Sequence, residues 1–488
     1  MAFRTWLAAL SLSAWSCVSA HANSGLELRP LATDTFFSVP PNQPTALRFQ
    51  ASGTGHDTHP WTYEIRDYAE QVIARGAARL SRGRLQLTVK LPEGYYQVSF
   101  DGVADSFGFS VAPPFTGARD PFFGIDAALS WVTHDPAARK ALISAIAKSG
   151  IGIARERVGW MLIEPGFGIW NWNARDDYDT VRKLYRASGI KLLEALYGGP
   201  AGWDFERDPP GDRNSALARS ADKLVGRWGD VWAAVEVWNE IDLRGVDPLK
   251  YVRVLRTVYE GVRRHGRSIK VVAGAFAKFN EPYLDQLADA GLLRYADALS
   301  IHPYGLSDET REMLHQYRRW VAKRGHPELP IWISESGRAW PRGPSRPPYV
   351  DDSRSAKWNT IRGVLARSEN TPVYFPFVLP FFEEKQLNYG LTDKSFTPLR
   401  AFAAYATSVR ILSHAKFIEL GSLRDARESY VFARNRERIL VVYTKDAGSV
   451  SAPAGLRGRV VGIDGRDLGA VRDTIPVPDG IAYVISPR

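Results

Sequence analysis

The chain has 488 residues, of which 45% are hydrophobic and 24% are charged. This ordinary globular composition excludes a disordered chain, and the length predicts two or three domains. The formal net charge is +10, which would suit a polyanionic partner. No run of five or more Lys or Arg occurs, however, so a solvated surface is favoured over a nucleic-acid groove, and no nucleic-acid partner is expected.

Residues 1–22 have the pattern of a secretory signal peptide. Arg4 precedes a short apolar stretch around 7–12, and an Ala-His-Ala sequence at 20–22 suits cleavage. The apolar stretch is too short to cross a bilayer, so no integral membrane segment is expected after signal removal. Cys17 is the single cysteine and lies inside this signal; its surroundings match a lipid-attachment site poorly. An exported protein, periplasmic or secreted and without disulfides, is predicted.

The stretch 23–115 follows the signal and contains short runs such as RLQLTVKLP and GYYQVSF, separated by turn clusters such as GTGHD. Alternation of period two with turns at this spacing predicts a β-sandwich. At the other end of the chain, residues 413–488 return to similar runs, including RILVVYT and GIAYVIS. They predict a second small β-domain.

Between them, residues 116–412 alternate apolar runs with amphipathic helical patterns that often end in Gly. Eight such units in about 290 residues predict a (β/α)₈ barrel of the TIM type. A doubly wound open sheet would show the same alternation, although no Gly-rich phosphate fingerprint follows the first run. The expected strands are 122–126, 151–156, 191–197, 233–238, 269–276, 298–302, 331–336 and 373–379.

Two of these strands end in a glutamate. Glu240 ends the fourth, in Trp-Asn-Glu, and Glu335 ends the seventh, in Ser-Glu-Ser, 95 residues later. Barrel chemistry lies at the C-terminal ends of the strands, so both carboxylates are expected at one mouth. An Asn-Glu pair alone is weak support, since Asn280-Glu281 is a second one; it precedes a proline and predicts a capped helix start.

Two carboxylates that face each other across a cleft suit the cleavage of a glycosidic bond. One must be protonated to donate to the leaving oxygen, and the other must be ionised to attack the anomeric carbon. This chemistry requires no cofactor. The chain has nine His, and no H-E-x-x-H spacing occurs, so no metal site is predicted.

Several segments resemble the clan A retaining glycoside hydrolases, most closely family thirty-nine and related bacterial exopolysaccharide endoglycosidases. They are the stretch 155–172, EVWNE, the His-Pro-Tyr at 302–304, WISESG and YGLTDKSFTPLRAFAAY. The resemblance covers the barrel well and the flanks loosely. It implies that Glu240 is the acid/base, that Glu335 is the nucleophile, and that Asn239 hydrogen-bonds the sugar 2-hydroxyl.

The resemblance also implies that Arg155 lies beside the nucleophile, where a cation would keep the carboxyl ionised. The alternative for Arg155 is a structural ion pair with Glu156 or Asp126. His302 and Tyr304 are implied to be substrate-site residues, with Tyr304 hydrogen-bonded to the nucleophile. Either residue could instead simply pack at its strand end.

The chain contains 15 Trp, and several follow or end barrel strands, where an indole face could stack on a sugar ring. Taken singly, each is as well explained by packing. Many clan members end strand eight with a tryptophan under the sugar, but in this chain the aromatic residues from 374 to 382 are all Phe or Tyr. The Trp residues expected at the mouth are Trp160, Trp203, Trp238 and Trp340.

The sequence therefore predicts an exported, retaining, endo-acting glycoside hydrolase that cleaves a polysaccharide, with a bacterial exopolysaccharide as the expected substrate. A monomer is expected, with the exopolysaccharide synthesis or export machinery as a candidate partner. Two alternatives remain open. One is an exo-acting β-glycosidase such as a β-xylosidase, and the other is a non-catalytic carbohydrate-binding or export scaffold.

Overall fold

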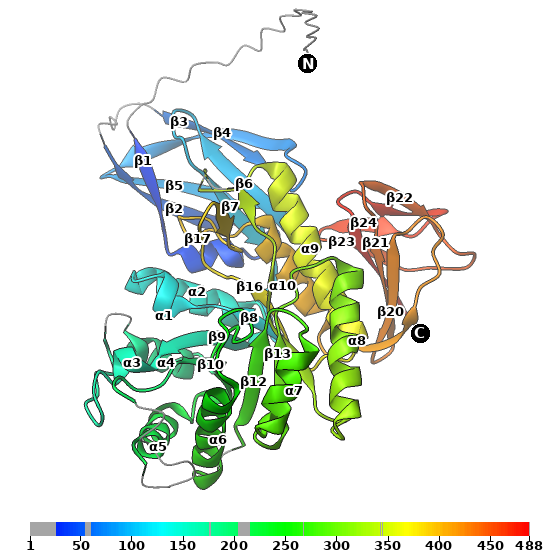
Figure 1. Ribbon diagram of the computed structural model, residues 1–488. Helices are drawn as coiled ribbons and strands as arrows, with labels where there is room; N and C mark the ends of the chain where they lie inside the picture. The colour runs from blue at the N-terminus through cyan, green and yellow to red at the C-terminus, as the bar shows by residue number, and fades with distance from the viewer. Residues whose placement is uncertain are drawn as a thin grey trace, which may run out of the picture.

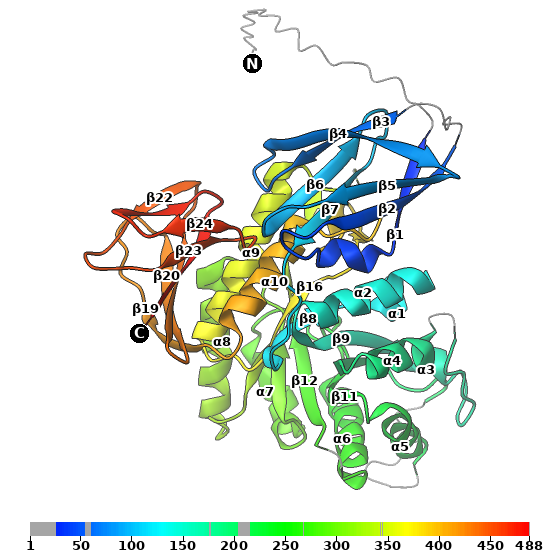
Figure 2. The same ribbon diagram turned by 180° about the vertical axis from the view of Figure 1, so that it is seen from behind.

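The computed structural model describes residues 26–53, 60–174, 177–203, 215–266, 268–341, 343 and 345–487. The predicted signal peptide with Cys17 lies outside the described residues. Figures 1 and 2 show three groups of elements: N-terminal strands in blue, a helix-covered barrel from cyan to yellow, and C-terminal strands in orange and red.

The central barrel is closed by eight parallel strands in the order β10-β11-β12-β13-β14-β16-β8-β9. The fold class predicted from the sequence is confirmed. Because the strands are parallel, their C-terminal ends share one mouth. The strands are β8 (Asp120–Asp126), β9 (Ile151–Gly159), β10 (Lys191–Tyr197), β11 (Trp232–Val237), β12 (Lys270–Phe276), β13 (Ala298–Ile301), β14 (Ile331–Gly337) and β16 (Tyr374–Phe377).

Helices cover the barrel. Several of them begin at a polar residue that is followed one or two positions later by a proline. Asp135, Asp247 and Asn280 each accept a hydrogen bond from a backbone N–H in the first turn of the helix that follows. The predicted cap at Asn280 is thus confirmed. The helices are α1 (Leu129–Val132), α2 (Pro136–Lys148), α3 (Trp160–Ile163), α4 (Tyr178–Ala187), α5 (Ala216–Trp228), α6 (Pro248–Arg264), α7 (Glu281–Asp289), η2 (Leu292–Arg294), α8 (Ser307–Lys323), α9 (Tyr349–Ser368) and α10 (Arg400–Leu412).

The N-terminal strands form one seven-stranded antiparallel sheet, in the order β1-β2-β5-β4-β3-β6-β7. The sheet folds over itself, since the ring of Phe49 on β2 lies 5.3 Å from that of Phe100 on β6, although β5, β4 and β3 intervene. The elements are β1 (Glu27–Leu31), η1 (Thr33–Phe37), β2 (Thr45–Ser52), β3 (Pro60–Arg66), β4 (Val72–Ser81), β5 (Arg84–Val89), β6 (Gly94–Phe100) and β7 (Ser106–Val111).

The C-terminal strands form a six-stranded sheet and a two-stranded sheet that enclose their own apolar core. A further small sheet joins segments that follow strands seven and eight of the barrel: β15 (Trp340–Pro341), β17 (Phe382–Glu384) and β18 (Leu387–Tyr389). The C-terminal strands are β19 (Lys416–Leu420), β20 (Glu428–Arg434), β21 (Glu437–Tyr443), β22 (Gly448–Ser451), β23 (Arg459–Gly462), β24 (Asp467–Ala470), β25 (Thr474–Val477) and β26 (Ile481–Pro487).

Ion pairs connect the N-terminal unit to the barrel. Arg400 on α10 bonds to Glu70 of the N-terminal unit and lies 3.0 Å from Asp352 on α9. Arg410 on the same helix bonds to Glu93. Because Arg400 is buried, loss of one of its partners would leave a charge uncompensated. Within the described part of the chain, no helix is both long and apolar enough to span a membrane.

Candidate active site

The two predicted catalytic glutamates lie at the mouth of the barrel, on strands that are three positions apart. Glu335 is part of β14, and Glu240 follows β11 in a tight turn. In that turn both Trp238 and Glu240 have positive φ angles, 64° and 49°, which non-glycine residues rarely adopt. The Glu240 N–H donates to the carbonyl of Ala275 at the end of β12 (3.0 Å). Local strain is thus used to fix the direction of one carboxylate.

The carboxylates of Glu240 and Glu335 face the same residue, His302, which follows β13. One side-chain atom from each of the three lies within 4.8 Å of the other two. His302 Nδ1 is 3.2 Å from Glu240 Oε1 and 3.9 Å from Glu335 Oε1. A separation of this order suits a retaining glycosidase, in which the two carboxyl groups are about 5–5.5 Å apart. An inverting enzyme needs a wider gap.

Glu335 is held in its ionised form. Its Oε2 accepts from Arg155 (2.7 Å) and Arg157 (3.1 Å), and its Oε1 accepts from the hydroxyl of Tyr304 (2.7 Å). Burial alone would raise the pKa of this carboxyl, but the charges of His302, Arg155 and Arg157 and the Tyr304 hydrogen bond outweigh burial and lower the pKa to about 2. The carboxylate is therefore suited to act as a nucleophile.

Arg155 is fully buried at the centre of the site and serves both of the roles considered for it. Besides Glu335, it contacts Asp126 (2.8 Å) and Glu236 (2.8 Å). The expected ion pair with Asp126 is present. Glu156 points elsewhere and accepts hydrogen bonds from the backbone N–H groups of Leu129 and Ser130.

Arg155 also orients Asn239. A guanidinium can only donate, so the side-chain oxygen of Asn239 must face it, at 2.7 Å. The amide NH₂ of Asn239 then points away from the arginine, beside Glu240. In this position it can donate to a sugar hydroxyl, as the resemblance implies.

A second arginine, Arg157, was not among the predicted site residues. Besides Glu335, it binds both oxygens of Asp126 and contacts the hydroxyl of Tyr197 (3.0 Å). The signal was present in the sequence: alternate residues of a strand point to the same side, so Arg155 and Arg157 on β9 must share a face. Glu236, in the apolar strand β11, was likewise not among the predicted site residues.

His302 connects Glu240 to the strand that carries Glu335. Its Nδ1 faces Glu240, and its Nε2 lies 3.1 Å from the hydroxyl of Ser334. A protonated Glu240 can donate to Nδ1, whereas an ionised Glu240 can accept from it. The imidazole therefore accommodates both protonation states that an acid/base residue must take.

The four mouth tryptophans differ in their surroundings. Trp160 is 0% exposed, its indole N–H donating to Glu164 (3.0 Å), and Trp340 is 1% exposed. Packing closes both rings off, so the prediction that they stack on sugar is corrected. Trp203 is half-buried, with the Lys250 ammonium 5.8 Å from its ring. Trp238 is half-buried and stacks on Tyr251.

Other aromatic rings gather beside the glutamates instead. Phe377, at the end of strand eight, packs edge to face with Tyr389 (5.3 Å) and Phe382 (5.8 Å), which lie on β18 and β17. The ring of Trp131, which is 42% exposed, lies 4.8 Å from that of Phe382 at an angle of 50°, and the Arg157 guanidinium is 5.4 Å from the Trp131 ring. These rings lie at and beside the end of strand eight, where the clan that the barrel resembles often has a tryptophan under the sugar.

Glu240, His302 and Glu335 are also close enough together to ligate a metal ion. Both oxygens of Glu335, however, already accept hydrogen bonds, two of them from guanidinium groups. Positive charge around Glu335 opposes a bound cation. This donor set fits proton transfer better than metal binding.

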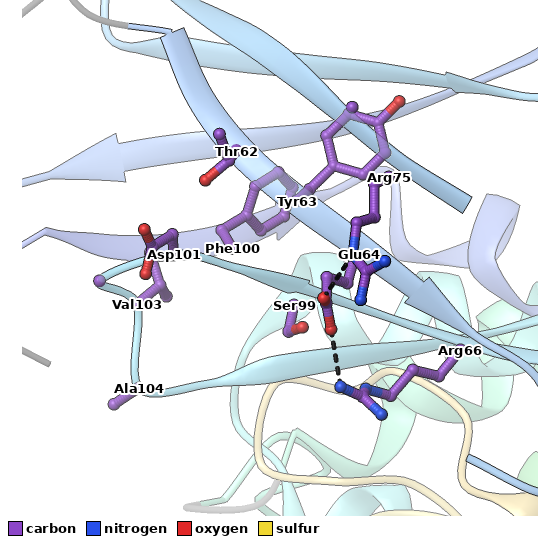
Figure 3. Close-up of a pocket in the computed structure, with 12 residues that line it drawn as sticks. Thr62, Tyr63, Glu64, Arg66, Arg75, Ser99, Phe100, Asp101, Val103 and Ala104 are labelled. Atoms are coloured by element: carbon purple, nitrogen blue, oxygen red, sulfur yellow. Dashed lines mark hydrogen bonds and ion pairs between the residues drawn. The ribbon is translucent and has the colours of Figure 1, made fainter. Parts of the chain in front are cut away.

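A separate groove of 760 Å³ lies on the N-terminal sheet (Figure 3). There Glu64 pairs with Arg66 (2.6 Å) and Arg75 (2.8 Å). The lining residues come from β3, β4, β6 and the turn after β6. None of the catalytic candidates belongs to this groove.

Comparisons with known proteins bear on the fold. No protein-family model and no curated protein sequence matches the chain. A family 39 glycoside hydrolase from the gut symbiont Bacteroides cellulosilyticus has a similar structure, with a TM-score of 0.75 at 17% identity over 95% of this chain and 100% of its own. A family 39 β-xylosidase from Caulobacter crescentus (TM-score 0.51, 16% identity) and a glucosidase from Croceicoccus marinus (0.53, 12%) each align over 77% of this chain and 98% of theirs. At these identities the likeness shows a shared fold.

Proposed function

We propose that the protein is a retaining glycoside hydrolase that uses Glu335 as its nucleophile and Glu240 as its acid/base. One observation carries the proposal. The carboxylates of Glu240 and Glu335, at the ends of strands four and seven, each have an oxygen within 4.8 Å of the other and of a ring nitrogen of His302. The buried carboxylate, that of Glu335, accepts hydrogen bonds from two arginines and a tyrosine. The fold shared with family 39 enzymes supports the same reaction.

In the first step, Glu335 Oε1 or Oε2 attacks the anomeric carbon while Glu240 protonates the oxygen of the departing sugar. The glycosidic bond breaks and an ester to Glu335 forms. In the second step, Glu240 removes a proton from water, the water oxygen attacks the same carbon, and Glu335 leaves as a carboxylate. Two inversions give net retention.

The surrounding residues support these steps. While Glu335 is esterified, Arg155 still has Glu236 as a counter-ion and Arg157 still has Asp126, so neither cation is left unpaired. This balance allows the charge on Glu335 to disappear and return without a large electrostatic penalty.

The substrate we propose is a polysaccharide cleaved internally, with a bacterial exopolysaccharide as the first candidate, and the site of action is outside the cytoplasm. The apparent signal at 1–22 and the exposed rings at the mouth support this. The printed descriptions of two structural neighbours, a β-xylosidase and a glucosidase, favour exo action as a second candidate. The size of the products distinguishes the two candidates: internal cleavage of a polysaccharide releases long oligosaccharides, whereas exo cleavage releases single sugars.

A screen for new reducing ends on purified exopolysaccharides, xylan and β-glucans, with 4-nitrophenyl β-glycosides as short substrates, tests the activity. Glu335→Gln should leave less than about a thousandth of wild-type turnover. On the best short substrate, azide should rescue Glu240→Ala with retention and Glu335→Ala with inversion. A Glu335→Gln variant with near wild-type activity, or rescue with the opposite stereochemistry, would refute the assignment.

A further inference from the structure

The segment between Trp160 and Trp172 leaves the mouth end of β9, the strand that carries Arg155 and Arg157. After α3 it forms a hairpin in which the N–H of Ile169 donates to the carbonyl of Gly166 (2.9 Å). Gly168 has a φ of 76°, as the third position of such a turn requires. In both ribbon views the hairpin projects beside α3 (Figures 1 and 2).

Glu164, which is fully buried, fixes the base of this hairpin. One carboxylate oxygen accepts from the N–H of Gly168 (3.0 Å) and the hydroxyl of Ser220 (2.7 Å), and the other accepts from the indole of Trp160. The carbonyl of Glu164 accepts from Ala201, in the loop after β10 (3.0 Å). The hairpin is thus held rigidly at the rim that also carries the catalytic site.

Two indoles are stacked at the end of this segment. The rings of Trp170 and Trp172 are 4.4 Å apart and nearly parallel, at 12°. The guanidinium of Arg227 lies 4.7 Å from the Trp172 ring, and Trp228 packs against its edge. Trp172 thus contacts Arg227, Trp228 and Trp170, and both stacked indoles remain half-buried rather than fully enclosed.

The hairpin also exposes large apolar side chains to solvent. Phe167 is 44% exposed and Ile169 is 64% exposed. These two side chains add nothing to the hydrophobic core and leave apolar surface in contact with water, which is unfavourable. A rigid rim with a half-buried indole and an exposed phenyl ring suits the apolar faces of sugar rings, which aromatic side chains bind by stacking.

We infer that the hairpin is a distal glycan-binding platform, on which Trp170 and Phe167 hold sugar units several positions from the cleaved bond. The inference rests on the proposed function and extends it. An enzyme with such a platform gains binding energy only from substrates long enough to reach it. Its kcat/KM must therefore rise with chain length.

The test uses oligosaccharides of two and eight units prepared from the polysaccharide that the wild-type protein cleaves fastest in the screen. In Phe167→Ala and Trp170→Ala, the ratio of kcat/KM on the octasaccharide to that on the disaccharide should fall about tenfold. Phe167 is at the exposed tip, so its variant does not depend on the Trp stack. Ile73→Ala removes an equally apolar exposed side chain from β4 and should leave the ratio unchanged.

The outcomes separate the two proposals. A wild-type protein without turnover on any substrate overturns both. Turnover with an unchanged ratio in the two hairpin variants overturns the platform alone. If the wild type sediments with phosphatidylglycerol vesicles and Phe167→Ala does not, the apolar tip serves a membrane surface, and the glycan platform is likewise refuted.

Discussion

The guanidinium of Arg157 lies 3.1 Å from the carboxylate of Glu335, although β9 and β14 are separated by β16 and β8 in the barrel. Arg155 reaches the same carboxylate oxygen from the same strand. Two cations thus share one acceptor, and Asp126 holds both in place. The charge of His302 lowers the pKa of Glu335 most, and this pair of arginines from a distant strand lowers it further.

Replacement of Arg157 should change the pH dependence of catalysis. Its charge helps to lower the pKa of Glu335 to about 2, so Arg157→Gln should raise that pKa and move the acid limb of kcat/KM to higher pH. Arg157→Lys keeps a cation and should move the limb less. The measurement is a pH profile on a 4-nitrophenyl glycoside; an unmoved acid limb in Arg157→Gln would contradict the role.

Tyr304→Phe should slow the reaction while leaving the fold intact. The variant loses a 2.7 Å hydrogen bond to Glu335, the proposed nucleophile, and hydrogen bonds to charged groups contribute about 1.5–3 kcal/mol, or roughly 10- to 150-fold in rate. The side chain is 38% exposed, so the melting temperature should stay close to that of the wild type. A rate loss below twofold would show that the hydroxyl is dispensable.

Trp160→Phe should lower stability rather than substrate affinity. The change removes buried ring atoms and leaves Glu164 without one of its donors, at a cost of about 1–3 kcal/mol. Thermal unfolding should show a lower melting temperature, whereas KM on a short glycoside should change little. A large rise in KM at unchanged melting temperature would restore the sugar-stacking role predicted for this ring.

The C-terminal unit contains a carboxyl group that titrates near neutrality. Burial raises the pKa of Asp479 to about 6, and Arg466 only partly offsets it. Because the folded-state pKa exceeds the unfolded value of about 3.9, this group favours the folded protein at low pH, and that contribution is lost as pH rises through 6. The change in melting temperature from pH 5 to pH 8 should therefore be more positive in Asp479→Asn than in wild type. An identical change in both proteins would refute the assignment.

The barrel, its strands and the meeting of Glu240 with Glu335 could all be predicted from the amino-acid sequence. These predictions depend on patterns of residues that are close in the sequence. The patterns are apolar runs that alternate with amphipathic helices, glycine at helix ends, the cap at Asn280, and a polar residue where a strand ends. Parallel strands place all their ends at one mouth, so strand ends alone were enough to bring Glu240 and Glu335 together.

Which side chains around the two glutamates are buried, and which form ion pairs, could not be predicted without the folded structure. Trp160, Trp340 and Trp203 all follow barrel strands in the sequence, yet residues from distant segments bury Trp160 and Trp340 and leave Trp203 half-buried. Arg157 found its partners across the barrel. Burial and ion pairing are sums over contacts from residues far apart along the chain, and local patterns do not contain those contacts.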